Sequence, residues 1–514
     1  MFSKVKSCAV HGVDGRMIDV EADVNDGLPV FTMVGYLSSS VRESSERVRT
    51  ALKNSGFHLP PKRITINLSP ADMRKDGSGY DLAIATAVLL SLGVTAELPM
   101  EQTLVLGELS LDGSIKAIPG VLPMVICARE EGMTSCIVPK ENVQEAALVQ
   151  GISVIGVSSL KETMEYIQGI KEYENTNVEQ PAVDTSEYLY DIDFSDVVGQ
   201  ESIKRGMEIA AAGFHNVLLT GAAGAGKSML AKRLPTILPQ MSFEESLEVT
   251  KIYSVGGMLP SEGGLIHRRP FRAPHHTISE YALIGGGRVP TPGEGSFAHY
   301  GVLFLDELPE FSKPVLEVLR QPLEDRRIRI SRVQASYEFP ADFMFVAAMN
   351  PCPCGNYPDY RRCSCTEQQI RRYQSKVSGP LLDRIDIRME VKGVKQEVLF
   401  SKQKTESSKT IRARVEQARQ MQKERFAGTG LLFNSQLDGK NLEEYITLSE
   451  EGKRLVLQLF EEQELSVRGV HRVLKLARTI ADLAGSEEIE HAHLQEAAFY
   501  RNQDVFAKEV LHGN

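Results

Sequence analysis

The sequence has no apolar run long enough to cross a membrane, no compositional bias and no excess of positive charge. Its longest apolar run, residues 82–96, lies between Asp81 and Glu97 and is shorter than the roughly 20 residues of a membrane helix. Hydrophobic residues make up 42% and charged residues 25% of the 514 residues, which excludes extensive disorder and collagen-like repetition. The net charge of -10 argues against a protein that coats nucleic acid over its whole surface, but it allows a local basic channel.

Two further absences concern the cellular compartment. The first residues, MFSKVKSCAVHG, contain no apolar core of the kind that signal peptides have. The number of cysteines is seven, which is odd and does not indicate a disulfide framework. We therefore expect a cytoplasmic protein with reduced thiols and no membrane partner.

The hydrophobic patterns divide the chain into regions, as expected of a length that exceeds one hydrophobic core. Residues 1–170 alternate short β-like segments with helical patterns, which is typical of an α/β domain. Residues 171–193 are acidic, lack a hydrophobic period and are expected to be a linker. In residues 194–393, three apolar β-rich runs predict the buried strands of a parallel sheet. Residues 394–514 have helical patterns and are expected to form an all-helical lid.

The most specific motif is GAAGAGKS, a phosphate-binding loop (P-loop) that follows the apolar run NVLLT and precedes a helical pattern. Its small residues let successive backbone N–H groups surround phosphates. Lys227 would reach the terminal phosphates of ATP, and Ser228 would supply a ligand to Mg²⁺. The residues expected to contact the nucleotide are Gly221, Ala222, Ala223, Gly224, Ala225, Gly226, Lys227, Ser228 and Met229.

Two other apolar runs end in groups that suit phosphoryl transfer. Residues 302–305 are followed by Asp306, which is expected to act at Mg²⁺, and by Glu307, which is expected to polarise the attacking water. As an alternative, the two carboxylates only cap the next helix. Residues 343–349 are followed by Asn350, whose amide would orient the water and sense the terminal phosphate.

The order of these motifs resembles that of AAA+ ATPases, and specifically the magnesium-chelatase-like branch of the YifB/ComM type. The resemblance extends over essentially the whole chain and includes RPFRAPHHTIS, ALIGGG, GVLFLDE, AAMNPCPCG, GPLLDRID and SVRG. It implies a homo-hexameric ring in which Arg384 is an arginine finger that completes a neighbouring subunit's site. It also implies that Arg468 is the sensor arginine of the lid. As an alternative, Arg384 forms a surface salt bridge with Asp383 or Asp386.

The N-terminal region resembles the catalytic domain of Lon proteases, a ribosomal S5 domain 2-like fold, in KDGSGYDLA, LGELSLDGSIKAIPG and CIVPKEN. Lon proteases use a serine and a lysine, and the corresponding positions here are Gly79 and Leu122. Acyl transfer needs a nucleophile and a base, so we expect this domain to lack it. Ser78 remains as a displaced nucleophile, but no base is placed for it. The expected α/β chain thus comprises a Lon-like domain, an AAA+ P-loop domain with a parallel sheet, and an α-helical lid.

A basic segment, DRRIRISRVQASYEFP, predicts a β-hairpin because two short β-like runs flank a polar turn. In related helicase-like rings a hairpin at this place projects into the central pore. The resemblance therefore implies that the hairpin contacts DNA phosphates through Arg327, Arg329 and Arg332, with Arg326 as a fourth positive charge. As an alternative, the hairpin is a solvated charged surface.

Four cysteines form a C-x-C…C-x-C pattern: Cys352, Cys354, Cys363 and Cys365. Four thiolates in a reducing compartment indicate a closed tetrahedral Zn²⁺ site of structural type. The pairs are closer than the usual two-residue spacing, so free thiols are the alternative.

Three functions are compatible with these motifs. The first is an ATP-driven hexameric motor on single-stranded or branched DNA that migrates branched intermediates in recombination or natural transformation, as the ComM resemblance implies. The second is an AAA+ ATPase that remodels a protein partner, as the magnesium-chelatase likeness allows. The third, an ATP-dependent protease, is disfavoured by Gly79 and Leu122.

Overall fold

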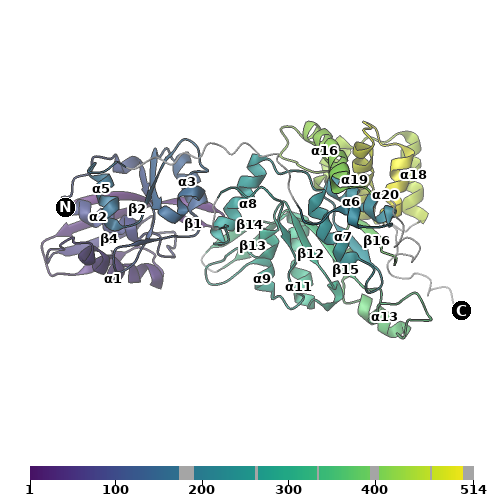
Figure 1. The fold of residues 1–514 in the computed structure, drawn as a ribbon, viewed down its shortest axis with the longest axis horizontal. Coiled ribbons are helices and arrows are strands. Elements are labelled where there is room, and N and C mark those ends of the chain that lie inside the picture. The colour runs from purple at the N-terminus through teal and green to yellow at the C-terminus, as the bar shows by residue number, and fades with distance from the viewer. Residues whose placement is uncertain (173–189, 261–263, 333–334, 394–404, 463–465, 502–514) are drawn as a thin grey trace.

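The protein is described by a computed structural model that covers residues 1–172, 190–260, 264–332, 335–393, 405–462 and 466–501. The expected linker is therefore outside the described residues from 173 to 189, and so is the expected start of the lid from 394 to 404. The molecule is elongated, with the N-terminal sheet at one end and the C-terminal helices at the other (Figure 1). None of the helices in these ranges combines the length and the apolar character that a membrane span requires.

The N-terminal domain is built on a seven-stranded mixed sheet with the order β3-β4-β2-β1-β5-β8-β9. Its strands are β1 (Phe2–His11), β2 (Asp14–Asn25), β3 (Phe31–Val34), β4 (Arg63–Ser69), β5 (Thr103–Val105), β8 (Ser135–Pro139) and β9 (Ser153–Val157), beside the small pair β6 (Glu108–Leu109) and β7 (Ile115–Lys116). Its helices are α1 (Ser39–Asn54), α2 (Asp81–Ser91), α3 (Val121–Glu130), α4 (Val143–Ala146) and α5 (Leu160–Ile167). Helix α2 packs against the sheet and α1 and is buried on nearly all sides, which explains its uninterrupted apolar sequence.

The central domain contains five parallel strands in the order β11-β12-β15-β10-β16. The inner strands β10 (Val217–Thr220), β12 (Val302–Leu305) and β15 (Met344–Met349) are buried along their whole length, as their apolar sequences predicted. The edge strands β11 (Phe271–Arg272) and β16 (Ile387–Glu390) are short and contain charged residues, so no hydrophobic run revealed them. The surrounding helices are α6 (Glu201–Gly213), α7 (Lys227–Arg233), α8 (Phe243–Val255), α9 (Glu280–Ile284), α10 (Glu294–Phe297), α11 (Lys313–Val318), α12 (Arg320–Asp325), α13 (Glu367–Gln374) and α14 (Gly379–Leu382).

The C-terminal region is helical in its described part, and the α/β class with a helical C-terminal region is confirmed. Its longer helices are α16 (Ser408–Arg425), α17 (Gly439–Tyr445), α18 (Glu450–Glu462), α19 (Val467–Leu483) and α20 (His491–Arg501). They share one apolar core with α6, β10 and β16. The ring of Phe433 stacks on Phe214 with centroids 4.3 Å apart, and the guanidinium of Arg419 lies 4.0 Å from the Phe433 centroid.

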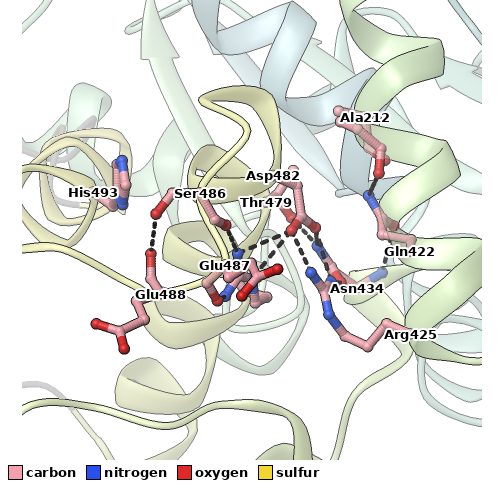
Figure 2. Close-up of polar contacts among 12 residues, drawn as sticks. Ala212, Gln422, Arg425, Asn434, Thr479, Asp482, Ser486, Glu487, Glu488 and His493 are labelled. Carbon is pink, nitrogen blue, oxygen red and sulfur yellow. Dashed lines mark hydrogen bonds and ion pairs between the residues drawn. The ribbon is translucent and has the colours of Figure 1, made fainter.

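A buried polar network holds the C-terminal helices together (Figure 2). The Asp482 carboxylate has no exposed surface and accepts hydrogen bonds from Arg425 Nη1 at 2.9 Å and Asn434 Nδ2 at 2.7 Å. On the neighbouring helix, Gln422 Nε2 donates to the Ala212 carbonyl of α6 at 3.0 Å. A buried carboxylate is costly unless it is paired, so this network fixes how α16, α19 and α6 meet.

The N-terminal domain docks on the central domain through the turn between β1 and β2. Val13 of this turn packs into the apolar core of the central domain. Gly12 has φ +69°, and a Cβ at this position would lie 2.9 Å from the Glu338 carbonyl, so the close approach requires glycine. The rings of His11 and Tyr337 stack with centroids 4.6 Å apart.

Asp386, the residue directly before β16, connects the central sheet to the C-terminal helices. Its buried carboxylate accepts a hydrogen bond from the Asn216 backbone at 3.0 Å and forms an ion pair with Arg472 of α19. Burial alone would raise its pKa, but the charge of Arg472 and the neighbouring His215 ring, whose Nδ1 lies 3.6 Å from the carboxylate, hold the pKa of Asp386 well below its usual range.

We predict that Asp386→Asn destabilises the protein by about 3–5 kcal/mol at pH 7, because the change removes a buried carboxylate and leaves the partly buried Arg472 without its anion. A depressed carboxyl pKa contributes stability above the unfolded-state pKa of about 3.9, and the contribution is lost as the pH falls further through the folded-state value. Denaturant unfolding at pH 7 checks the effect. Asp383→Asn is the control, since Asp383 is exposed in the same segment. Equal destabilisation by the two changes would contradict the prediction.

Candidate nucleotide site and arginine hairpin

The P-loop joins β10 to α7 and follows a path that requires glycine. Gly224 has φ +78° and Gly226 has φ +93°, which are left-handed backbone conformations that other residues rarely adopt. A Cβ at Gly221 would clash with the Val391 carbonyl after β16. The small residues of the motif therefore serve the turn itself and its close contact with the neighbouring strand.

Side chains from the segments that follow three parallel strands converge at this loop. The Lys227 ammonium donates to the Gly221 and Ala222 carbonyls at 2.7 and 2.9 Å, and it donates to Asn350 Oδ1 at 3.0 Å. The Ser228 hydroxyl donates to Asp306 Oδ2 at 2.5 Å. The sequence-predicted residues of the three strand ends thus lie in one hydrogen-bonded group.

The group has the chemistry expected of a site for Mg²⁺ and phosphates. Burial lowers the pKa of the Lys227 amine, and the carboxylates of Asp306 and Glu307 oppose that shift. Ser228 and Asp306 present a hydroxyl and a carboxylate side by side, which are the oxygen ligands that Mg²⁺ prefers. The donor set therefore fits a magnesium-bound nucleoside triphosphate.

Glu307 differs from the residues of the hydrogen-bonded group in its backbone conformation and in the exposure of its side chain. Its φ of +52° is uncommon for a residue with a side chain. Its backbone N–H donates to Asp306 Oδ1 at 2.9 Å, while its carboxylate is 60% exposed and lies 3.9 Å from His276 Nδ1. The sequence did not predict that His276 lies at this carboxylate. No motif in the sequence indicates that the segment RAPHH packs beside the end of β12.

Arg384 and Arg468 meet at a third residue, Glu324 of α12. Arg384 forms an ion pair with Glu324 and donates to the Pro380 carbonyl at 2.7 Å. Arg468 Nη2 lies 3.9 Å from the same carboxylate. Arg384 is thus ion-paired, but with Glu324 rather than with Asp383 or Asp386 as the alternative supposed.

The predicted hairpin is present as β13 (Arg327–Ser331) and β14 (Ser336–Pro340), which pair in antiparallel register. Arg327 and Arg329 are more than half exposed, and both pair with Glu338, at 2.6 and 2.8 Å. Arg332 is exposed and donates to the Gly287 carbonyl at 3.2 Å.

The expectation that Arg326 belongs to the hairpin is wrong. Arg326 has φ +55° and ends α12. Its guanidinium lies 3.6 Å from the Asp342 carboxylate and donates to the Ser435 carbonyl at 3.2 Å. The hairpin therefore has three arginines among its described residues, and the fourth contacts the C-terminal region.

A cavity of about 680 Å³ lies between this hairpin and the N-terminal domain. Its basic lining residues are Arg16, Arg74, Arg288 and Arg332, and its acidic ones are Asp14, Asp72, Asp76 and Glu131. Tyr337 of β14 also lines it. The docked N-terminal domain therefore places further charged side chains next to the hairpin.

The positions of the missing Lon dyad lie in ordinary packing environments. A Cβ at Gly79 would lie 3.1 Å from Ile118 Cδ1, and Leu122 is fully buried in α3. The Ser78 hydroxyl donates to the Glu108 carboxylate. The fully buried Lys75 donates to the Met73 carbonyl at 2.8 Å. Ser78 is therefore held by a carboxylate, whereas the nearby lysine is engaged by backbone.

The four cysteines of the C-x-C pairs come together in the loop after β15. Their Sγ atoms all lie within 4.8 Å of one another. Cys352 is buried, and the other three are partly buried. The pattern in the sequence thus corresponds to one compact cluster of thiols.

Comparison with known proteins identifies relatives over nearly the whole chain. The family description "Magnesium chelatase, subunit ChlI" matches residues 193–399, "Subunit ChlI of Mg-chelatase" matches residues 20–142, and "Magnesium chelatase, subunit ChlI C-terminal" matches residues 405–501. The competence protein ComM of Haemophilus influenzae is 40% identical over 503 residues and 97% of each chain. The YifB protein of Escherichia coli is 41% identical over 506 residues, 98% of this chain and 97% of that protein. Lon protease 2 of Bacillus subtilis is 30% identical over 183 residues, 32% of each chain.

Proposed function

The chain belongs to the YifB/ComM family of magnesium-chelatase-like AAA+ proteins, and we propose that it is an ATP-driven DNA motor that works as a homo-hexameric ring. The observation that carries this proposal is the combination of a phosphoryl-transfer group at the P-loop with an exposed arginine hairpin on the same domain. The proposed substrate is single-stranded or branched DNA in recombination or natural transformation. The proposed cofactors are ATP, Mg²⁺ and one structural zinc ion.

In the proposed hydrolysis reaction each side chain has a separate task. Lys227 neutralises the terminal phosphates, and Ser228 with Asp306 holds Mg²⁺, which supplies charge stabilisation when it is bound. Glu307, whose carboxylate is 60% exposed, polarises the attacking water. Asn350 links to Lys227 and orients that water.

The ring is proposed because Arg384 and Arg468 engage Glu324 rather than the hydrogen-bonded group of their own P-loop, as far as the described residues go. An arginine that serves a neighbouring subunit must be held in place until that subunit docks, and the Arg384 side chain, which is 11% exposed, pairs with the more exposed Glu324. The ion pair with Glu324 is a means of holding it. In the ring, Arg384 would exchange this carboxylate for the phosphates of the adjacent site.

The alternative is an ATPase of the magnesium-chelatase type that remodels a protein partner. It uses the same hydrolysis residues, and the magnesium-chelatase family match over residues 193–399 supports it. The two functions differ in the polymer that stimulates hydrolysis. A DNA motor responds to DNA and loses that response with added salt, whereas a protein-remodelling ATPase does not respond to DNA.

We predict that Lys227→Ala abolishes ATP binding, whereas Glu307→Gln binds ATP and hydrolyses it at least about 100-fold more slowly. The first change removes the charge that holds phosphates, and the second removes the group that polarises water. Fluorescent-nucleotide titration and steady-state phosphate release measure the two effects. Glu310→Gln is the control for Glu307, since Glu310 is exposed three residues further on. Weak ATP binding by Glu307→Gln would contradict the assigned role.

We predict that Arg384→Ala binds ATP but hydrolyses it poorly, because the finger acts on the neighbouring subunit. Mixing Arg384→Ala with Lys227→Ala chains creates interfaces in which an intact P-loop meets an intact finger. Hydrolysis by the mixture should therefore exceed that of either variant alone. If mixed rings form, as tandem affinity tags would show, and hydrolysis does not recover, Arg384 is not a finger.

We predict that four-way-junction or single-stranded DNA stimulates ATP hydrolysis and that Arg332→Ala loses this stimulation. The Arg332 guanidinium donates to a backbone carbonyl, whereas Arg327 and Arg329 share the carboxylate of Glu338, which offsets part of their charge. The removal of one phosphate contact should flatten the dependence of log affinity on log salt by roughly 0.7 to 0.9. ATPase assays and DNA-binding titrations over a salt series measure both effects.

The control for this prediction is Arg42→Ala, which removes an exposed arginine from α1 in the N-terminal domain. It should keep both the stimulation and the salt slope. No response of the wild-type protein to any DNA would favour the protein-remodelling function. DNA stimulation that Arg332→Ala retains in full would show that the hairpin is only a charged surface.

A further inference from the structure

We propose that the cysteine cluster binds one zinc ion, and that this ion fixes a loop, residues 351–365, which supports one side of the P-loop. The Sγ atom of Cys352 lies 3.4 Å from that of Cys354 and 3.8 Å from that of Cys363. Cys354 Sγ lies 3.6 Å from Cys363 Sγ. Thiolates at about 2.3 Å from a tetrahedral zinc ion are about 3.8 Å apart. A disulfide would need about 2.05 Å, so the observed spacing is that of metal ligands.

Backbone and side-chain N–H donors face the sulfurs of the cluster. The Tyr357 N–H donates to Cys352 Sγ at 3.4 Å. Asn356 Nδ2 lies 3.8 Å from Cys354 Sγ as a second donor. Gly355, with φ +79°, turns the chain between the first two cysteines and the rest, and its N–H donates to the Cys352 carbonyl at 3.0 Å. Donors that face ligand sulfurs stabilise their negative charge and fix their orientation.

Four thiolates fill the coordination sphere of a tetrahedral zinc ion. No position remains for water or substrate, so the ion has a structural role rather than a catalytic one. The compact cluster has room for one metal ion at its centre, since all four sulfurs lie within 4.8 Å of one another. The expected occupant is a single Zn²⁺, with iron as the alternative that metal analysis must distinguish.

The loop that the ion would fix touches the nucleotide site at two places. Asn350, the acceptor for Lys227, lies two residues before Cys352. A Cβ at Gly355 would lie 3.3 Å from the backbone nitrogen of Ala223 in the P-loop. On the other side, Gln374 of α13 donates to the Pro351 carbonyl at 2.9 Å. The loop therefore lies between the P-loop and α13. The ion would link its first two cysteines to its last two and so fix the loop in this position.

The proposal of a zinc ion rests on the cysteine geometry alone, whereas the proposed effect on nucleotide binding also rests on the proposed function of the P-loop. The two parts therefore need separate measurements. Metal content is measured without nucleotide, and nucleotide affinity is compared between metal-loaded and metal-stripped protein. Lys227→Ala separates them, because it should keep the zinc while it loses ATP.

The first experiment measures the metal. The full chain purified without chelators should contain about one zinc ion per chain by elemental analysis. The double change Cys352→Ser and Cys363→Ser should lose it, and Cys127→Ser, which alters a partly buried cysteine of the N-terminal domain, should keep it. Wild-type protein with no zinc, with iron in its place, or with zinc that the double variant retains overturns the metal site.

The second experiment measures ATP affinity in wild-type protein that is stripped with a chelator and then reloaded with zinc, so that it does not depend on the folding of a cysteine variant. Stripping should weaken affinity roughly tenfold or more, and reloading should restore it. Gly355→Ala should also weaken ATP affinity while zinc stays bound. Its control is Gly430→Ala, because Gly430 has φ +78° but a Cβ there would meet no atom within 4 Å, so it carries the same backbone cost without the P-loop contact. Unchanged affinity after stripping and in Gly355→Ala overturns the supporting role of the loop.

Discussion

The parallel register of β12, β15 and β10 is the constraint on which the candidate nucleotide site depends. Thr220 pairs with Met349, and Leu305 pairs with Ala347, so the three strands end at nearly the same level. The next residues along the chain are the P-loop, Asn350 and the two carboxylates. Because these strands are buried on both faces, a shift in register would expose apolar side chains as well as separate the polar ones. The same burial that stabilises the sheet therefore also aligns the hydrogen-bonded group.

The sequence predicted features that arise from local pattern and missed those that arise from packing between distant segments. The inner strands and the P-loop could be predicted because each is encoded by a short continuous pattern, an apolar run or a cluster of small residues. The short edge strand β11 could not, since its two residues have no period of their own. Glu324, the partner of Arg384, lies 60 residues away from it in the chain, and His276 reaches Glu307 from a separate segment. Such pairs follow from the tertiary fold, which spacing in one sequence does not reveal.

The N-terminal domain combines a protease-like scaffold with a docking role. Its β1–β2 turn inserts Val13 into the core of the central domain, and its His11 stacks on Tyr337 of the hairpin strand β14. The buried Glu145 accepts a hydrogen bond from Ser254 of α8, and this interaction also spans the two domains. A free peptidase site would need an open approach for an extended peptide. Here the cavity of about 420 Å³ beside Ser78 and Gly79 is also lined by Val255 and Tyr337 of the central domain, so both domains form its walls.

The segment between β15 and β16 contains three of the proposed functional elements. It begins with Asn350, continues through the cysteine loop and α13, and reaches Arg384 just before β16 begins. In a ring, one end of this segment would face the nucleotide of its own subunit and the other end that of its neighbour. A loop whose two ends are linked by a metal ion moves as one rigid unit. A movement at one end therefore reaches the other end, whereas a flexible loop would change its own shape instead. In the proposed ring, a metal-bound cluster at that place would allow the state of one P-loop to alter the position of Arg384, the proposed finger for the neighbouring subunit.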